Sequence, residues 1–255
     1  MVINSSNDRY LELLEEIAKN TRSKANYILT VSGVGSDITT IYQQPIKLDP
    51  TRQYEVALTN LETYYSFPNI DSTNNKLNYR AKNSDDWKTV TIPVGCYEIN
   101  AINASIIKQV GSDNIQTLAN LNTQQCKLII KSPFEVNFDI ANSLRTTLGF
   151  NAKTYLHGIH QSENLVNILR VNSVLVHTDI ISGSYLQGRI EPIIYSFFPD
   201  VLPGEKIMQV QQNLIYAPVT RDSIYRMVTW LTDQDNNKID LRGETLTVRY
   251  HLRER

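Results

Sequence analysis

Side chains in the C-terminal third of the chain, residues 171–255, alternate between apolar and polar with the period of a β-strand. Successive side chains of a strand point to opposite faces, so this alternation predicts strands with one buried face. The clearest run is Leu246, Thr247, Val248, Arg249, Tyr250, His251, Leu252 and Arg253. No residue set in this third is typical of catalysis.

Length and composition bound the class of protein. A chain of 255 residues can form one large β domain or two small ones. A hydrophobic fraction of 41% and a charged fraction of 20% are ordinary for a folded globular protein. The net charge of −1 gives no long-range field that would attract nucleic acid or an anionic membrane, so we expect no sequence-specific nucleic-acid binding.

The cysteines and the N-terminus indicate a compartment. Only Cys96 and Cys126 are present, which argues against a disulfide framework and indicates maturation in a reducing compartment. The start of the chain lacks a basic segment followed by an apolar run, and no stretch is long and apolar enough to span a bilayer. We therefore expect neither export by a signal peptide nor a membrane span.

Residues 8–20 show the clearest helical pattern. Charged side chains lie mostly on one side of this helix, and cap-prone residues precede it. We expect residues 1–25 to form a helical arm and residues 26–255 to form the β domain. The arm either folds back on its own domain or docks on another subunit. Its predicted contact residues are Tyr10, Leu11, Leu14 and Ile17.

The body of the chain reads as many short strands with few helices, which indicates a sandwich or a barrel. We expect an amphipathic helix over 99–110 ending at Gly111, a short helix over 141–148, and an exposed excursion over 66–86. A turn over 233–243 is expected to pair 223–232 with 244–252. Expected strands are 27–32, 39–48, 53–61, 76–79, 87–93, 127–131, 134–139, 165–169, 173–178, 190–198, 206–211, 223–232 and 244–252.

Two patterns suggest a metal site, and we interpret both as structural. Residues 233–244 carry acidic and amide side chains at several positions of an EF-hand loop, but Lys238 stands where that loop needs glycine and the flanks read as strands. His157, His160 and Glu163 are spaced as ligands on a helical turn, but Gly158 interrupts them and the surroundings read as a loop. We expect no metal ligand in either segment.

Patterns for catalysis or cofactor binding are equally weak. His177 and Asp179 have the residue types of a nucleophile triad, but no serine lies in a nucleophile elbow, and the pair suits a half-exposed strand. Gly33 and Gly35 lack the third glycine and the helix of a dinucleotide site, which indicates a turn. We expect no catalytic or cofactor-binding residue and no enzymatic activity.

Basic side chains gather on one face of the last predicted strand. Arg249, His251, Arg253 and Arg255 share this face, with Arg242 nearby. They form a small stripe without the aromatic ladder of a nucleic-acid site. We interpret Arg249, His251 and Arg253 as a solvated or subunit-facing surface.

Five segments between about Asn26 and Arg255 resemble a known family. They read YEVAL (54–58), IPVGCY (92–97), NSLRTTLGF (142–150), PIIYSFFP (192–199) and LRGE (241–244). The family is that of the minor capsid, or penton, proteins of Polinton (Maverick) elements and adintoviruses. These segments join turns to apolar strands, so the resemblance transfers a fold and no catalytic residue.

The resemblance implies a mainly β protein, an antiparallel jelly-roll β-sandwich with a few short helices and an N-terminal amphipathic helix. A compact double jelly roll is the alternative. It also implies a capsid subunit of the virion, made in the host cytoplasm or nucleus, which assembles with itself as a pentamer and contacts the major capsid protein and a host receptor. A trimeric double-jelly-roll major capsomer and a spike or fibre-base receptor-binding module remain alternatives.

Overall fold

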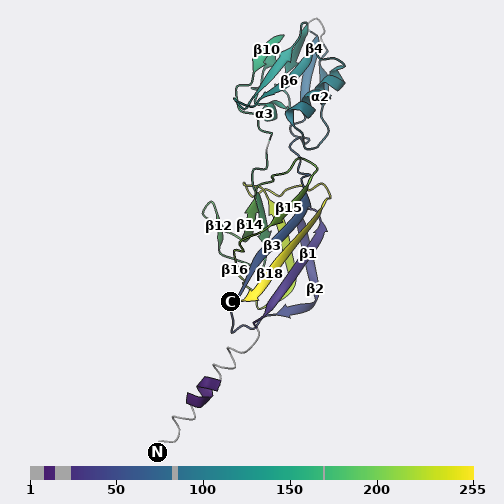
Figure 1. Cartoon of the computed structure of the whole chain (residues 1–255). Coiled ribbons are helices and arrows are strands. Elements are labelled where there is room, and N and C mark those ends of the chain that lie inside the picture. The colour runs from purple at the N-terminus through teal and green to yellow at the C-terminus, as the bar shows by residue number, and fades with distance from the viewer. Residues whose placement is uncertain (1–8, 15–23, 82–85, 169) are drawn as a thin grey trace, which may run out of the picture.

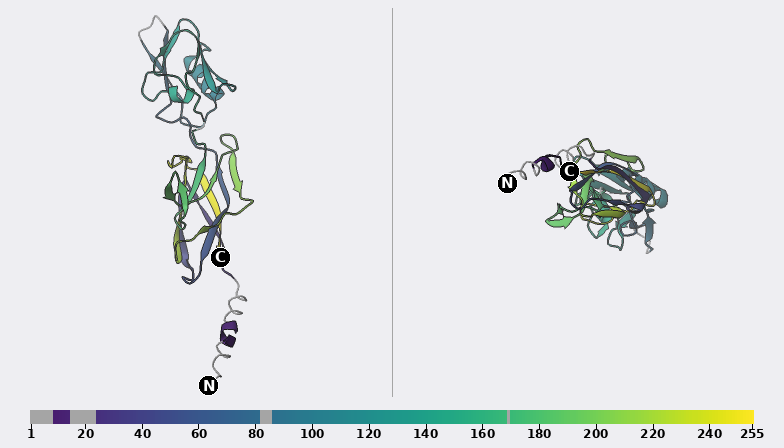
Figure 2. Two further views of the ribbon diagram at one scale, coloured as in Figure 1. Left: turned by 90° about the vertical axis from the view of Figure 1, so that its left-hand side faces the viewer. Right: turned by 90° about the horizontal axis from the view of Figure 1, so that it is seen from below.

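The computed structural model describes residues 9–14, 24–81, 86–168 and 170–255. Within them the chain is mainly β and carries two separate hydrophobic clusters, one in each of two lobes. Figure 1 shows the lobes end to end, and the view turned by 90° in Figure 2 shows the same arrangement. The C-terminus lies at the end of the first lobe that is opposite the second lobe.

The first lobe is a jelly roll of eight strands. One sheet has the order β1-β18-β3-β15, and the other has the order β14-β11-β17-β2. Numbered along the chain, these strands form sheets 1-8-3-6 and 5-4-7-2, which is the order of an eight-stranded jelly roll. The strands are β1 (Asn26–Val34), β2 (Asp37–Lys47), β3 (Tyr54–Tyr64), β11 (Val174–Thr178), β14 (Ile193–Phe197), β15 (Lys206–Val210), β17 (Ser223–Thr232) and β18 (Thr245–Glu254).

The alternation along β18 determines which of its side chains enter the core of this lobe. The apolar side chains of the strand are buried in the interface between the sheets, as the sequence predicts. Tyr250 is among the largest of the fully buried side chains, and its hydroxyl lies 2.8 Å from the Thr229 hydroxyl on β17 in the opposite sheet. This hydrogen bond satisfies two buried polar groups and links the two layers.

The predicted pairing of 223–232 with 244–252 is wrong. β17 pairs with β2 and β11, whereas β18 pairs with β1 and β3. Each strand has one apolar face, and these faces pack against each other across the core. The connection over 233–243 therefore crosses from one sheet to the other.

The second lobe is inserted between β3 and β11, the third and fourth strands of the jelly roll. Its sheets have the orders β5-β4-β8-β9 and β10-β7-β6. Ile102 and Ile106 of helix α2 are fully buried in its core. Its elements are β4 (Lys76–Ala81), β5 (Lys88–Thr91), α2 (Ile99–Val110), β6 (Ile115–Asn120), β7 (Gln125–Ile130), β8 (Phe134–Asn137), α3 (Arg145–Leu148), β9 (Thr154–Tyr155) and β10 (Gly158–Gln161).

Two minor elements complete the jelly-roll lobe. β12 (Ser184–Leu186) and β13 (Arg189–Glu191) form a hairpin between β11 and β14, and β16 (Ala217–Pro218) pairs with β3. Gly35, with φ of 88°, lies in the tight turn between β1 and β2, as the reading of Gly33 and Gly35 predicts.

Local predictions in the inserted lobe are confirmed in part. Gly111 ends α2 in the left-handed conformation, as predicted. Residues 165–168 form no strand, and the short helix α3 begins at Arg145, later than expected. The segment after β3 is not an exposed excursion, because Phe67, Ile70 and Leu77 are buried. Its asparagines suggested a loop, but they cap turns inside the lobe: the Asn74 side chain donates to the Asn69 carbonyl at 2.9 Å.

Residues 9–14 are helical and exposed, so this part of the helix predicted over 8–20 is confirmed. Exposed fractions are 66% for Tyr10, 58% for Leu11 and 46% for Leu14. Ile17 lies outside the described residues. No helix of the described segments is long and apolar enough to cross a membrane.

Candidate functional site

The junction between the lobes holds a network of polar side chains, and Asn69 makes several of its hydrogen bonds. Its side-chain nitrogen donates to the carbonyls of Tyr97 at 2.7 Å and Ile168 at 2.9 Å, and its side-chain oxygen accepts from the Tyr97 amide at 2.8 Å. Only 6% of Asn69 is exposed. The side chain of Asn69 therefore links the segment that enters the inserted lobe with the segment that leaves it.

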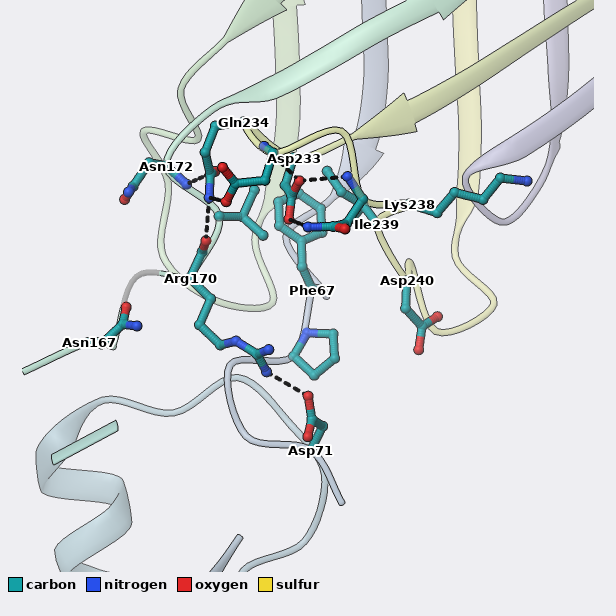
Figure 3. A pocket seen from close by; sticks show the side chains of 14 residues that line it. Phe67, Asp71, Asn167, Arg170, Asn172, Asp233, Gln234, Lys238, Ile239 and Asp240 are labelled. Carbon is teal, nitrogen blue, oxygen red and sulfur yellow. Dashed lines mark hydrogen bonds and ion pairs between the residues drawn. The ribbon is translucent and has the colours of Figure 1, made fainter. Parts of the chain in front are cut away.

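One side of the junction is a polar pocket of about 660 Å³, shown in Figure 3. Arg170 pairs with Asp71 at 2.5 Å across it. The Gln234 amide donates to the Arg170 carbonyl at 3.1 Å and accepts from the Asn172 amide at 3.0 Å. Burial opposes ionisation of Asp71, but hydrogen bonds from Thr73 and Arg170 outweigh it and hold its pKa below the ordinary value.

Asp233 shows why this pocket is not an EF-hand. Its carboxylate accepts hydrogen bonds from the backbone amides of Asp235 at 2.9 Å and Asn237 at 2.8 Å, which makes it the cap of a tight turn. Strands β17 and β18 flank the turn, where an EF-hand needs helices. The polar groups of the pocket are therefore engaged with one another and join the lobes.

The other side of the junction is an apolar hollow of about 730 Å³, which we call the interlobe groove. Three strongly exposed apolar side chains line it: Leu121 at 87%, Phe198 at 54% and Leu202 at 60%. Leu121 lies in the β6–β7 turn of the inserted lobe, and the other two lie between β14 and β15 of the jelly roll. Cys96 also lines the groove, and burial raises the pKa of its thiol, which keeps it in the unreactive neutral form.

His177 and Asp179 are held in separate networks. His177 is fully buried, not half-exposed as expected, and it stacks on Trp230 with ring centroids 5.0 Å apart. Its Nε2 lies 2.8 Å from the Thr232 hydroxyl, and burial lowers its pKa to about 4. Asp179 instead pairs with Arg221 at 2.8 Å and accepts from the Val228 amide. The two residues are structural.

His157, His160 and Glu163 likewise do not converge on a metal. They lie around strand β10, where a loop was expected, and His160 Nε2 lies 2.7 Å from the Leu156 carbonyl oxygen. Burial alone would raise the pKa of Glu163, but hydrogen bonds from Lys153 and Tyr155 lower it to about 2. In the described segments no three His, Cys, Asp or Glu side chains group in a metal-binding arrangement.

The basic stripe of β18 is largely engaged within the chain. Arg253 pairs with Glu55 at 2.7 Å, and its guanidinium lies 3.6 Å from the centroid of the Tyr216 ring. The two nitrogens of His251 lie 2.6 Å from the Tyr216 hydroxyl and 2.6 Å from the Asn26 side-chain oxygen. These contacts order the outer face of the sheet. A contact of Arg249, His251 and Arg253 with another subunit stays a prediction.

The site residues of the junction were not found from the sequence. Asn69, Arg170 and Gln234 are distant in the chain and only the fold brings them together. Phe198 and Leu202 flank the segment Pro199-Asp-Val, and apolar residues on both sides of a proline-containing connection were a signal that the sequence offered. The strand expected over 190–198 included Phe198 instead.

The architecture is that of an antiparallel β protein, a jelly roll with a second lobe inserted between its third and fourth strands. A crystal structure of selenomethionine-labelled mavirus penton protein aligns with it at a TM-score of 0.51 and 10% identity, covering 91% of this chain and 100% of that one. The chain thus shares its fold with a viral penton protein. No family model and no curated protein matches the sequence.

Two further solved structures show little similarity. Both are of the flagellar cap protein FliD from Escherichia coli, with TM-scores of 0.24 and 0.18 at 12% and 13% identity. They cover 83% and 87% of this chain, and 100% and 55% of theirs. They are too dissimilar to bear on the fold.

Proposed function

We propose that the chain is a structural capsid protein of a virus or virus-like element, a penton or minor capsid subunit that assembles with copies of itself and has no catalytic role. The observation that carries this proposal is the jelly-roll topology together with the likeness to mavirus penton protein over nearly the whole chain. The virion is the corresponding location, and the major capsid protein is the corresponding neighbour. Residues 1–25 act as an arm and residues 26–255 as the capsid domain.

The edges of the jelly roll support self-assembly. At one side of the sandwich, β1 and β2 expose Ile28 at 69% and Ile41 at 74%. At the other side, β15 exposes Val210 at 66%, and the adjoining hairpin exposes Tyr185 at 69%. Contacts between two unlike sides of identical subunits close into rings. These two sides are the surfaces that we assign to neighbouring subunits.

Native mass spectrometry of the purified chain tests the assembly. We expect a pentamer, which Ile41→Arg and Val210→Arg disrupt because each buries an unpaired charge at an edge. Ile159→Arg, in a similarly exposed position of the inserted lobe, is the matched control and leaves the number of subunits in the assembly unchanged. A trimer would favour the major capsomer or a fibre base, and a monomer at high concentration would contradict self-assembly.

The N-terminal arm has a separate expected effect. The double variant Leu14→Asp, Ile17→Asp removes apolar contacts of the arm, so it abolishes attachment of the arm to another protein and leaves the melting temperature of the β body unchanged. Co-sedimentation with assembled capsid protein and thermal unfolding measure the two effects. Unfolding of the body in this variant would show instead that the helix belongs to the core.

A second candidate function, receptor binding, is favoured by the position of the inserted lobe. This lobe lies at the end of the molecule opposite the C-terminus (Figures 1 and 2). A glycan and cell-surface binding screen with Leu156→Ser and Ile159→Ser tests it, since both side chains are exposed on this lobe. Loss of binding with assembly intact would support a receptor-binding module.

A further inference from the structure

The interlobe groove combines an apolar lining with unbalanced negative charge. Its acidic residues are Glu98, Asp200 and Glu205, and no lysine, arginine or histidine lines it. Glu98 and Asp200 are exposed and take part in no ion pair among the described residues. Glu205 accepts a hydrogen bond from the Leu202 amide at 2.9 Å, which fixes its carboxylate at the rim.

Three exposed apolar side chains line the groove together. Leu121, Phe198 and Leu202 converge on one hollow from both lobes, so they form a contiguous apolar patch and not scattered single residues. Such a patch with a polar rim marks an interaction site. The size of the groove, about 730 Å³, accommodates several side chains of a partner.

We propose that the interlobe groove binds a peptide segment of a partner protein in which apolar side chains stand next to a lysine or arginine. The apolar side chains cover Leu121, Phe198 and Leu202, and the cation lies against Glu98 and Asp200. Because the groove is lined by both lobes, the bound segment also fixes one lobe against the other. The proposal stands whether or not the chain assembles, since one copy provides the whole groove.

The charges select this occupant over the arm of a second copy. Residues 10–14 offer exposed Leu11, Leu13 and Leu14, but Glu12 lies among them and Glu15 and Glu16 follow in the sequence. Residues 10–17 therefore carry three acidic and no basic side chains, and Arg9 stands before them. An acidic segment against an acidic rim is disfavoured by like-charge repulsion. A basic segment instead gains attraction that salt screens.

Fluorescence anisotropy of labelled synthetic peptides tests the proposal with the full-length chain. The probe is a short peptide in which leucine and lysine alternate. The comparison peptides replace lysine by glutamate, replace leucine by serine, or copy residues 10–17. We expect saturable binding of the leucine–lysine peptide alone, weakened by added salt.

Variants of the groove sharpen the test. Glu98→Gln and Asp200→Asn each weaken binding about two- to fivefold and reduce its salt dependence. Leu121→Ser combined with Leu202→Ser weakens it about tenfold or more. These side chains are exposed, so melting temperatures stay unchanged. Leu156→Ser and Asp139→Asn, exposed on the inserted lobe outside the groove, are matched controls without effect.

Three results would overturn the proposal. Equal binding of the lysine and glutamate peptides would remove the role of the acids. Preferred binding of the peptide that copies residues 10–17 would make a second copy the occupant. Binding that is insensitive to Leu121→Ser with Leu202→Ser would place the peptide elsewhere. Failure of self-assembly in native mass spectrometry leaves these measurements interpretable, because they read peptide binding to a single chain.

Discussion

Single side chains of the jelly-roll core carry much of its stability, and Val248 is the most direct test. This residue is fully buried between the sheets. Val248→Asp places an unpaired carboxylate there, and we expect loss of the native state, because burying an uncompensated charge costs several kcal/mol and native stability is only about 5–15 kcal/mol. Circular dichroism and urea unfolding measure the loss.

Thr245→Asp is the control for Val248→Asp. Thr245 begins the same strand and is exposed, so the added charge remains solvated and the stability changes by less than about 0.5 kcal/mol. A folded Val248→Asp protein would mean that the two faces of β18 are the reverse of those described.

His177 makes the stability of the jelly roll depend on pH. Burial lowers its pKa from 6.5 to about 4, and its Nδ1 has no hydrogen-bond partner in the described chain. His177 therefore takes up a proton below about pH 6.5 in the unfolded chain, but only below about pH 4 in the folded chain. The free energy of unfolding that neutral His177 preserves is fully present above pH 6.5 and declines as the pH drops from 6.5 to 4. The total decline is about 3 kcal/mol.

Urea unfolding between pH 7 and pH 4 measures this loss. His177→Phe keeps a ring against Trp230 and removes the titrating group, so its stability declines less steeply over the same range. His157→Phe changes an exposed histidine, so its free energy of unfolding depends on pH as in the wild type. Identical slopes for wild type and His177→Phe would exclude His177 as the source.

At the scale of elements, the junction predicts a measurable cost for one amide. Asn69→Ala leaves the carbonyls of Tyr97 and Ile168 and the Tyr97 amide without their partner, and each buried unpaired group costs about 1–3 kcal/mol. We expect a lower free energy of unfolding and faster amide exchange at residues 65–72 and 166–172. Hydrogen exchange with mass spectrometry locates the change.

Asn122→Ala is the matched control, because Asn122 is exposed in the β6–β7 turn. It should leave both exchange and stability as in the wild type. Unchanged exchange near the junction in Asn69→Ala would show that the lobes are held together by other contacts.

Elements were predictable from the sequence where the pattern was local. The alternation along β18 gave its buried face, and the apolar spacing with Gly111 gave the extent of α2. The partner strands of β17 were not predictable, because its sequence is compatible with pairing to any strand that has one apolar face. The arrangement of all the strands in the sandwich determines the pairing. The buried asparagines of 69–75 misled the prediction, since their turn-forming chemistry is the same inside a lobe as outside it.

The junction could not be predicted for a related reason. Its residues come from segments about a hundred positions apart, and no local pattern links Asn69 with Ile168. The expectation of no catalytic residue stays a prediction, which rests on the sequence neighbours that each candidate lacks. The fold class followed from strand periodicity, while the jelly roll itself was expected from the family resemblance.

For the whole molecule, two hydrophobic clusters predict two units of stability. Ile106 is fully buried in the inserted lobe, and Ile106→Ala costs about 2–5 kcal/mol there. We expect this variant to lower the stability of the inserted lobe while amide exchange in β1, β3 and β18 stays slow. Exchange that rises equally in both lobes would show a single cooperative unit.

The hydrogen bond between Asn69 and Ile168 has a consequence for the chain entropy of the jelly roll. It holds the two ends of an insertion of about a hundred residues within one side chain's reach. The cost of closing a flexible loop grows with its length, but a folded insertion with adjoining ends is closed by its own packing. For the entropy of connecting β3 to β11, the inserted lobe is thus equivalent to a tight turn. Another compact domain with adjoining ends would fit the same position at a similar entropic cost.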